Sequence, residues 1–167
     1  MLLSRESVDL LIARDGERTI VRSAGRGEAT IAYDDRGYHY RRETGDPLVV
    51  GRDVVGATAD AAYDAMCATD YPDGIVQIAH LAASPRAGEI ILSAARDWDF
   101  RSKYEPIPHV SSHGALHREH MLVPLLVNRP VSTRPRRTVD VMPSALALLG
   151  KAIPSGLDGT TFMRLAS

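Results

Sequence analysis

The chain has 167 residues, of which 44% are hydrophobic, enough for one domain with a sizeable core. Its 20 lysines and arginines and 21 aspartates and glutamates give a net charge of −1. The chain therefore has no excess of positive charge that would favour binding to nucleic acid or to an anionic membrane. The single cysteine, Cys67, excludes an internal disulfide, and no apolar run approaches the roughly 18 residues that span a bilayer. We therefore expect a soluble, cytoplasmic protein with no nucleic-acid or membrane partner.

The first 45 residues have the pattern of short β-strands separated by turns. Asp15-Gly16-Glu17 and Asp35-Arg36-Gly37 suit tight hairpin turns, and each lies between runs rich in Val, Ile, Leu or Tyr. Apolar side chains alternate along the later runs, at Ala29, Ile31, Tyr33, Tyr38 and Tyr40. This alternation predicts a sheet with one buried face and one solvent-exposed face. We expect an antiparallel meander of three or four strands.

Two helices are expected in the middle of the chain, after Gly45-Asp46-Pro47 breaks the strand pattern. Residues 57–68 are rich in alanine, and residues 74–83 place apolar side chains at helical spacing. Asp73 is placed to cap the second helix, and residues 84–88 are placed to end it. Within these helices, we expect Cys67 to be a small buried residue and His80 to be a surface residue or one with a local partner.

Two continuous apolar runs follow, at residues 89–94 and 121–127. Continuous apolar character is typical of strands that are covered on both faces, as in a layered α/β sheet, and Pro124 fits a bulge or an edge. Residues 139–149 predict a helix over one face of that sheet, with Pro143 in its first turn and Gly150 at its end. The expected fold class is α/β, in a single domain of residues 1–167 with a β meander (1–45) and an α/β part (46–167).

Histidines are concentrated just before the second apolar run. His113, His117 and His120 follow His109 closely, and a catalytic zinc site needs about three such ligands from the protein. The spacing of four between His109, His113 and His117 would align them on a helix, but the surrounding prolines, serines and Gly114 predict a loop. Spacing alone therefore does not define a metal site.

Four short motifs occur in a fixed order between residues 112 and 159: Ser112-His113-Gly114, Val123-Pro124-Leu125, Val139-Asp140-Val141-Met142-Pro143 and Leu157-Asp158-Gly159. In this order and spacing they resemble the C-terminal part of the alkaline phosphatase superfamily, in its type I phosphodiesterase and nucleotide pyrophosphatase branch. Residues 8–47 are similar, more weakly, to the strand-rich region after the family's Asp-His-Gly motif. The resemblance implies a partial alkaline-phosphatase-like layered sheet and a metal-dependent phosphoric-ester hydrolase.

The resemblance assigns one metal ligand, His113. Asp97, Asp99, His109 and His117 are candidates for side chains that support the metal ligands, although aspartates after a strand more often form turns. The complete enzyme would use two zinc-like ions on a small phosphate ester. The family's nucleophile and other metal ligands have no counterpart here, and no Asp-His dipeptide occurs. We therefore expect the C-terminal portion of such a hydrolase, inactive and without zinc when alone.

Two other interpretations stay open. The chain could be a non-catalytic binding or assembly module, because a partial domain exposes apolar surface that a complementing N-terminal half, or a second copy, would cover. It could also be an independent zinc protein that uses His109, His113, His117 and His120, which would require supporting hydrogen bonds and a closed tetrahedral geometry. The sequence does not indicate which phosphate ester would be the substrate.

Overall fold

A computed structural model of the chain describes residues 2–100 and 113–163. The chain forms two compact units, Met1–Val123 and Pro124–Ser167, and each is described by itself. The described residues contain six strands in one antiparallel sheet and four α-helices, which confirms a mixed α/β fold. The alkaline-phosphatase-like layering and the single domain of residues 1–167 stay predictions.

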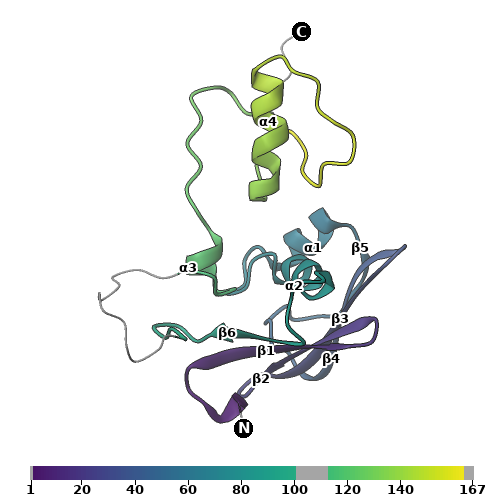
Figure 1. Cartoon of the computed structure of the whole chain (residues 1–167), viewed down its shortest axis with the longest axis vertical. Helices are drawn as coiled ribbons and strands as arrows, with labels where there is room; N and C mark the ends of the chain where they lie inside the picture. Colours follow the sequence, from purple (N-terminus) through teal and green to yellow (C-terminus); the bar gives the residue numbers. More distant parts are fainter. Residues whose placement is uncertain (1, 101–112, 164–167) are drawn as a thin grey trace. The chain divides into compact units, whose positions relative to one another are not determined.

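The sheet of the first unit is built on the expected meander. A short 3-10 helix, η1 (Leu2–Ser4), precedes β1 (Val8–Asp15), β2 (Arg18–Ser23), β3 (Gly27–Asp34) and β4 (Gly37–Gly45), and each of these strands pairs antiparallel with the next. The full order is β5-β4-β3-β2-β1-β6, so β5 (Val54–Ala57) and β6 (Ile90–Ala94) form the two edges (Figure 1). The prediction of a meander in the first 45 residues is confirmed.

Local chemistry explains the sharp turn between β3 and β4. The Asp34 carboxylate accepts hydrogen bonds from the backbone N–H (2.9 Å) and the guanidinium (2.8 Å) of Arg36, and it also contacts His39 (3.0 Å). Together these hydrogen bonds hold the pKa of Asp34 well below its usual range. Gly37 follows with φ +118°, and a Cβ there would lie 2.4 Å from the carbonyl oxygen of Ala57, so only glycine fits.

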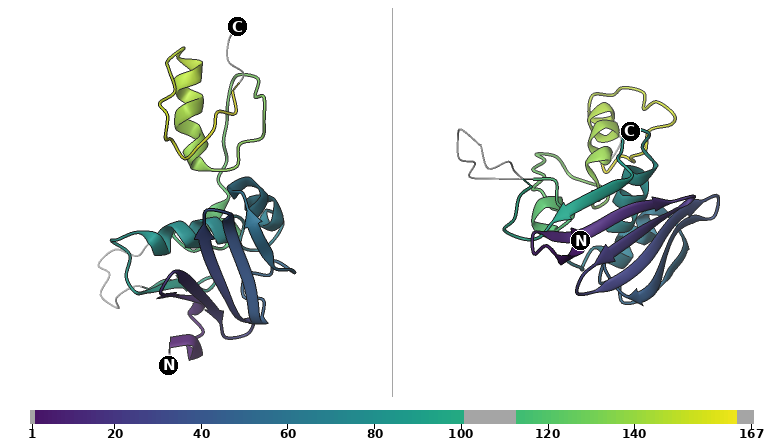
Figure 2. Two further views of the ribbon diagram at one scale, coloured as in Figure 1. Left: turned by 90° about the vertical axis from the view of Figure 1, so that its right-hand side faces the viewer. Right: turned by 60° about the horizontal axis from the view of Figure 1, so that its bottom comes forward.

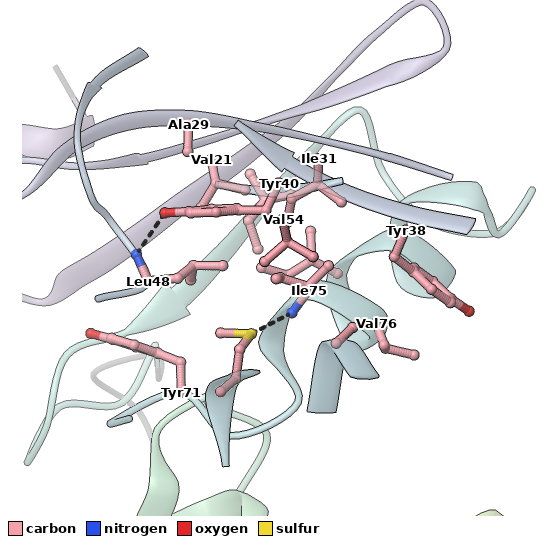
Figure 3. Packing of buried hydrophobic residues seen from close by; sticks show 14 of the residues in the cluster. Val21, Ala29, Ile31, Tyr38, Tyr40, Leu48, Val54, Tyr71, Ile75 and Val76 are labelled. Carbon is pink, nitrogen blue, oxygen red and sulfur yellow. Dashed lines mark hydrogen bonds between the residues drawn. The ribbon is translucent and has the colours of Figure 1, made fainter. Parts of the chain in front are cut away.

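Both predicted helices of the first unit are present and cover one face of the sheet. They are α1 (Ala59–Met66) and α2 (Gly74–Ala83), and Figures 1 and 2 show them on the same side of β1–β4. The side chains between helices and sheet form the core, with Tyr40 lying fully buried across its centre (Figure 3). The Tyr40 hydroxyl donates to Asp46 Oδ1 (2.6 Å) and accepts from the backbone N–H of Leu48 (3.4 Å).

Some details of this unit differ from the sequence-based expectations. Asp73 occupies the N-cap position of α2, but its backbone is left-handed (φ +63°) and its side chain makes no capping bond; it accepts instead from Gln77 Nε2 (2.7 Å). Tyr33 is 63% exposed, because it lies at the end of the β3–β4 hairpin and packs against Tyr38. Cys67 ends α1 and is only half-buried.

The two apolar runs are not strands covered on both faces. β6 is an edge strand that pairs antiparallel with β1, and Ile90 is 55% exposed. Residues 121–127 form no strand: helix α3 (Arg118–Met121) ends there, and Leu125 and Val127 are 43% and 36% exposed. The prediction for 121–127 is wrong because Pro124 has no N–H to donate, and because no described strand forms backbone hydrogen bonds with this segment.

The second unit contains the last predicted helix. A 3-10 turn, η2 (Thr138–Asp140), leads into α4 (Val141–Leu148), which confirms a helix within residues 139–149. Pro143 lies in its first turn, and Gly150 follows its end with φ +60°, as expected. The predicted covering of a sheet strand at 121–127 is lost together with that strand.

Candidate functional site

His113, the predicted metal ligand, is the first residue of the described range 113–163. It is exposed and lies in irregular backbone, and Gly114 beside it has φ +99°, a conformation that favours glycine. The loop leads into α3, and the prediction that it leads into a strand beginning at Met121 is wrong. The reason is that residues 117–121 close a helical turn, with His120 and Met121 donating backbone hydrogen bonds to the carbonyl of His117.

Arg118 fixes this segment to the first unit. Its backbone N–H and its guanidinium donate to three carbonyls in the turn between α1 and α2, those of Asp70 (2.7 Å), Thr69 (3.0 Å) and Cys67. Upstream, the backbone N–H of Leu116 donates to Ser93 Oγ on β6 (3.2 Å). The loop that bears His113 is therefore anchored on its C-terminal side by two separate sets of contacts.

The two other described histidines near His113, which are His117 and His120, make local contacts. His117 packs edge-on against Tyr71, with ring centroids 6.1 Å apart, and its Nδ1 is buried without a hydrogen-bond partner in the described structure. His120 Nδ1 accepts from the backbone N–H of Ala115 (3.3 Å). Within residues 2–100 and 113–163, no group of three or more His, Cys, Asp or Glu side chains is placed to hold a metal ion.

The remaining candidates lie on either side of residues 101–112. Asp97 is in the turn after β6 with φ +67°, next to a hydrogen bond from Trp98 N to Ala95 O (3.1 Å), which is a turn-forming role. Asp99 is exposed on the same stretch. His109 lies outside the described residues. A role for Asp97, Asp99, His109 or His117 in supporting a metal ligand stays a prediction.

A polar cluster in the first unit was not predicted. Asp9 accepts from the Arg26 guanidinium (2.7 Å) and from the Tyr71 hydroxyl (2.7 Å), and Arg26 also lies 5.2 Å from the centre of the Tyr71 ring. Burial, together with the hydrogen bond to Asp9, raises the pKa of Tyr71. Through Tyr71 the cluster touches His117. The three residues are far apart in the sequence, so no local pattern could have revealed them.

Exposed apolar side chains mark residues 122–127. Leu126 is 95% exposed, and Leu122, Val123 and Leu125 are 43–65% exposed. Within the second unit, residues 125–128 and α4 border a groove of about 520 Å³ whose walls include Leu126, Leu148 and Phe162. We name residues 122–127 the apolar segment. Exposed large apolar side chains of this kind are common at association sites.

Asp140, from the motif Val139-Asp140-Val141-Met142-Pro143, is a hydrogen-bonding centre of the second unit. Its carboxylate accepts three backbone N–H groups, those of Arg136 (3.2 Å), Arg137 (3.1 Å) and Thr160 (3.0 Å). Its carbonyl accepts from Ser144 Oγ (2.6 Å), which itself accepts from the backbone N–H of Phe162 (3.0 Å). The motif therefore holds the residues before α4 and residues 160–162 against the start of this helix.

The chain matches no family model, no curated protein and no solved structure. In the part of the chain that the structure describes, no helix has both the length and the apolar character needed to cross a membrane.

Proposed function

We propose that the chain is the C-terminal portion of a metal-dependent phosphoric-ester hydrolase domain, in which His113 supplies one ligand to a zinc ion. The observation that supports this most directly is the apolar segment, which follows the anchored His113 loop and lies open to solvent. In the resemblance that the motifs suggest, this segment is a sheet strand. An uncovered strand sequence is what a portion of a larger layered sheet would present.

The energetics favour covering this segment. Complete burial of an exposed leucine or valine side chain contributes about 2 kcal/mol, so covering Leu122, Val123 and Leu126 would supply several kcal/mol to an association. The described residues do not form a zinc site by themselves, because three or four converging ligands are needed and His113 has no such neighbours there. In the proposed complete domain, the other ligands and the nucleophile come from an N-terminal half, and the substrate is a small phosphate ester.

The decisive experiment begins with the coding sequence upstream of Met1. If the reading frame continues into an Asp-His-Gly motif, the longer chain is expressed and assayed with bis(4-nitrophenyl) phosphate after chelation and after zinc is restored. We expect zinc-dependent turnover that falls by about 100-fold or more in His113→Ala. His120→Ala is the matched control and should stay within about twofold, because His120 bonds only to its own loop. A continuous frame whose product has no zinc-dependent turnover would contradict the proposal.

The same exposed segment also favours a second candidate, a non-catalytic binding or assembly module. This candidate predicts that the 167-residue chain associates through the apolar segment without any upstream sequence. Light scattering after gel filtration should then show an oligomer that Leu126→Asp converts to a monomer. Tyr33→Asp, which replaces another exposed apolar side chain away from this segment, is the control and should leave the oligomer intact. A monomeric wild-type chain would exclude self-association.

A further inference from the structure

A pocket of about 540 Å³ lies between the β1–β2 hairpin, β3 and the C-terminal end of α2. We name it the hairpin pocket; its polar lining consists of Arg14, Glu17, Arg18, Thr19, Tyr33, His80 and Ser84. Its volume falls within the range of about 300–1,000 Å³ that is typical of small-molecule sites. It belongs wholly to the first unit, and neither the metal-ligand prediction nor the apolar segment involves it.

One wall of the hairpin pocket is aromatic and held in place. Tyr33 packs on Tyr38 with ring centroids 4.5 Å apart, and 63% of Tyr33 stays exposed. His80 stacks on the same tyrosine at 6.0 Å and shares a hydrogen bond of 2.6 Å between its Nε2 and the Tyr38 hydroxyl. Because Tyr38 is buried, the rings of Tyr33 and His80 are presented from a fixed base. Such a surface suits stacking of another planar ring.

The lining of the hairpin pocket also carries positive charge. The Arg14 guanidinium caps α2 by donating to the carbonyls of Ala82 and Ser84, so this cation is fixed at the pocket. Arg18 is exposed and forms no ion pair with any other described residue. With Glu17 as the only acidic residue of the lining, the two arginines leave the pocket with one net positive charge. The pocket therefore favours a ligand with one negative charge over a dianion.

Thr19 places a hydroxyl at the pocket. The residue is 8% exposed and lines the pocket, and its hydroxyl makes no hydrogen bond with any other described residue, so it is left to bond with whatever occupies the pocket. An acceptor atom of a ligand can take a hydrogen bond from this hydroxyl in place of water. A carboxylate oxygen is such an acceptor.

We propose that the hairpin pocket binds a small aromatic monocarboxylate, with its ring stacked on Tyr33 and its carboxylate between Arg18 and the Thr19 hydroxyl. This inference does not depend on the proposed hydrolase function, since it uses none of the residues assigned there. Recognition of the ring and of the charge are separate, so each can be tested separately.

The test is a titration of the ¹⁵N-labelled 167-residue chain with benzoate, followed by two-dimensional NMR. We expect saturable shifts confined to amides around the pocket, such as those of Ala32 and Ala83, with a dissociation constant of about 1 mM or lower. Benzamide has the same shape without the charge, and acetate has the charge without the ring. Each should bind about tenfold more weakly than benzoate. The dianion of adenosine monophosphate should also bind more weakly than benzoate.

Variants assign the binding to the proposed residues. Arg18→Gln, Thr19→Val and Tyr33→Leu should each weaken benzoate binding by about fivefold or more, in chains whose spectra stay dispersed as in the wild type. Arg52→Gln removes an exposed arginine outside the pocket and should leave the affinity unchanged. The proposal is overturned if benzoate causes no saturable shift, if benzamide binds equally well, or if Arg18→Gln has no effect.

Discussion

Replacing Asp140 should unfold the second unit while the first unit stays folded. In the wild type, the Asp140 carboxylate accepts three backbone N–H groups, from Arg136, Arg137 and Thr160, and the side chain is about nine-tenths buried. Asp140→Ala removes both acceptor oxygens and so all three of these hydrogen bonds. Asp140→Asn keeps the shape but turns one acceptor oxygen into a donor, so at least one of the three bonds is lost.

The size of the effect follows from the number of bonds. A hydrogen bond to a charged acceptor contributes about 1.5–3 kcal/mol, so three of them correspond to about 4–9 kcal/mol. A unit of the size of Pro124–Ser167 has a total stability of only about 2–7 kcal/mol if it follows the average for folded proteins. Asp140→Ala should therefore unfold the second unit. Asp140→Asn, with one bond lost in its better rotamer, should destabilise it by about 1.5–3 kcal/mol.

Hydrogen exchange followed by mass spectrometry measures the two units separately. In Asp140→Ala we expect loss of protection in α4 and unchanged protection in β1–β4, with Asp140→Asn between this variant and the wild type. Asp158→Ala is the control, because Asp158 is an exposed carboxylate of the same unit with no described partner. Full protection of α4 in Asp140→Ala, or loss of protection in the sheet as well, would refute this reasoning.

Three further outcomes are expected. Burial raises the pKa of Tyr40 and of Tyr71, so the free energy of unfolding should be highest below the ordinary tyrosine pKa of about 10 and should fall as the pH rises above it. Tyr40→Phe should be less stable at neutral pH by about 1–3 kcal/mol, but its free energy of unfolding, measured in urea titrations, should fall less at alkaline pH. Val49 has φ +56°, which a β-branched residue adopts unfavourably, so Val49→Asn should raise the free energy of unfolding by about 1 kcal/mol, and no gain in urea titrations would contradict this strain. Arg118→Ala should speed hydrogen exchange in residues 113–121 while the sheet stays protected, whereas unchanged exchange would show that Arg118 is not the anchor.

The parts of the fold that were predicted correctly depend on local information. Strand turns such as Asp15-Gly16-Glu17 are encoded within a few residues, and Gly16 adopts the expected positive φ of +62°. Helices α1 and α2 follow from composition and from apolar side chains at helical spacing, and Thr58 caps α1 by accepting from Ala61 N (3.2 Å). In each case the residues that determine the element are also the residues that form it.

The errors concern features that depend on distant residues. Whether an apolar run such as 121–127 becomes a covered strand depends on a neighbouring strand, and the run itself contains no information about that neighbour. The cluster of Asp9, Arg26 and Tyr71 likewise joins three separate elements. The apolar character of β6 predicts burial on both faces, but an edge position next to β1 also accommodates it.

The four motifs behind the family resemblance differ in the kind of evidence that they provide. Asp140 and Gly159 serve the internal closure of the second unit: Asp140 accepts backbone N–H groups, and a Cβ on Gly159 would lie 2.1 Å from the carbonyl oxygen of Val139. Any chain that builds this unit needs such residues, whether or not it is an enzyme. Among the motif residues, His113 is the one to which the resemblance assigns a metal-ligand role, and it is exposed on an anchored loop. The comparison of His113→Ala with His120→Ala in the longer chain therefore tests the hydrolase proposal more directly than any measurement on the other motifs.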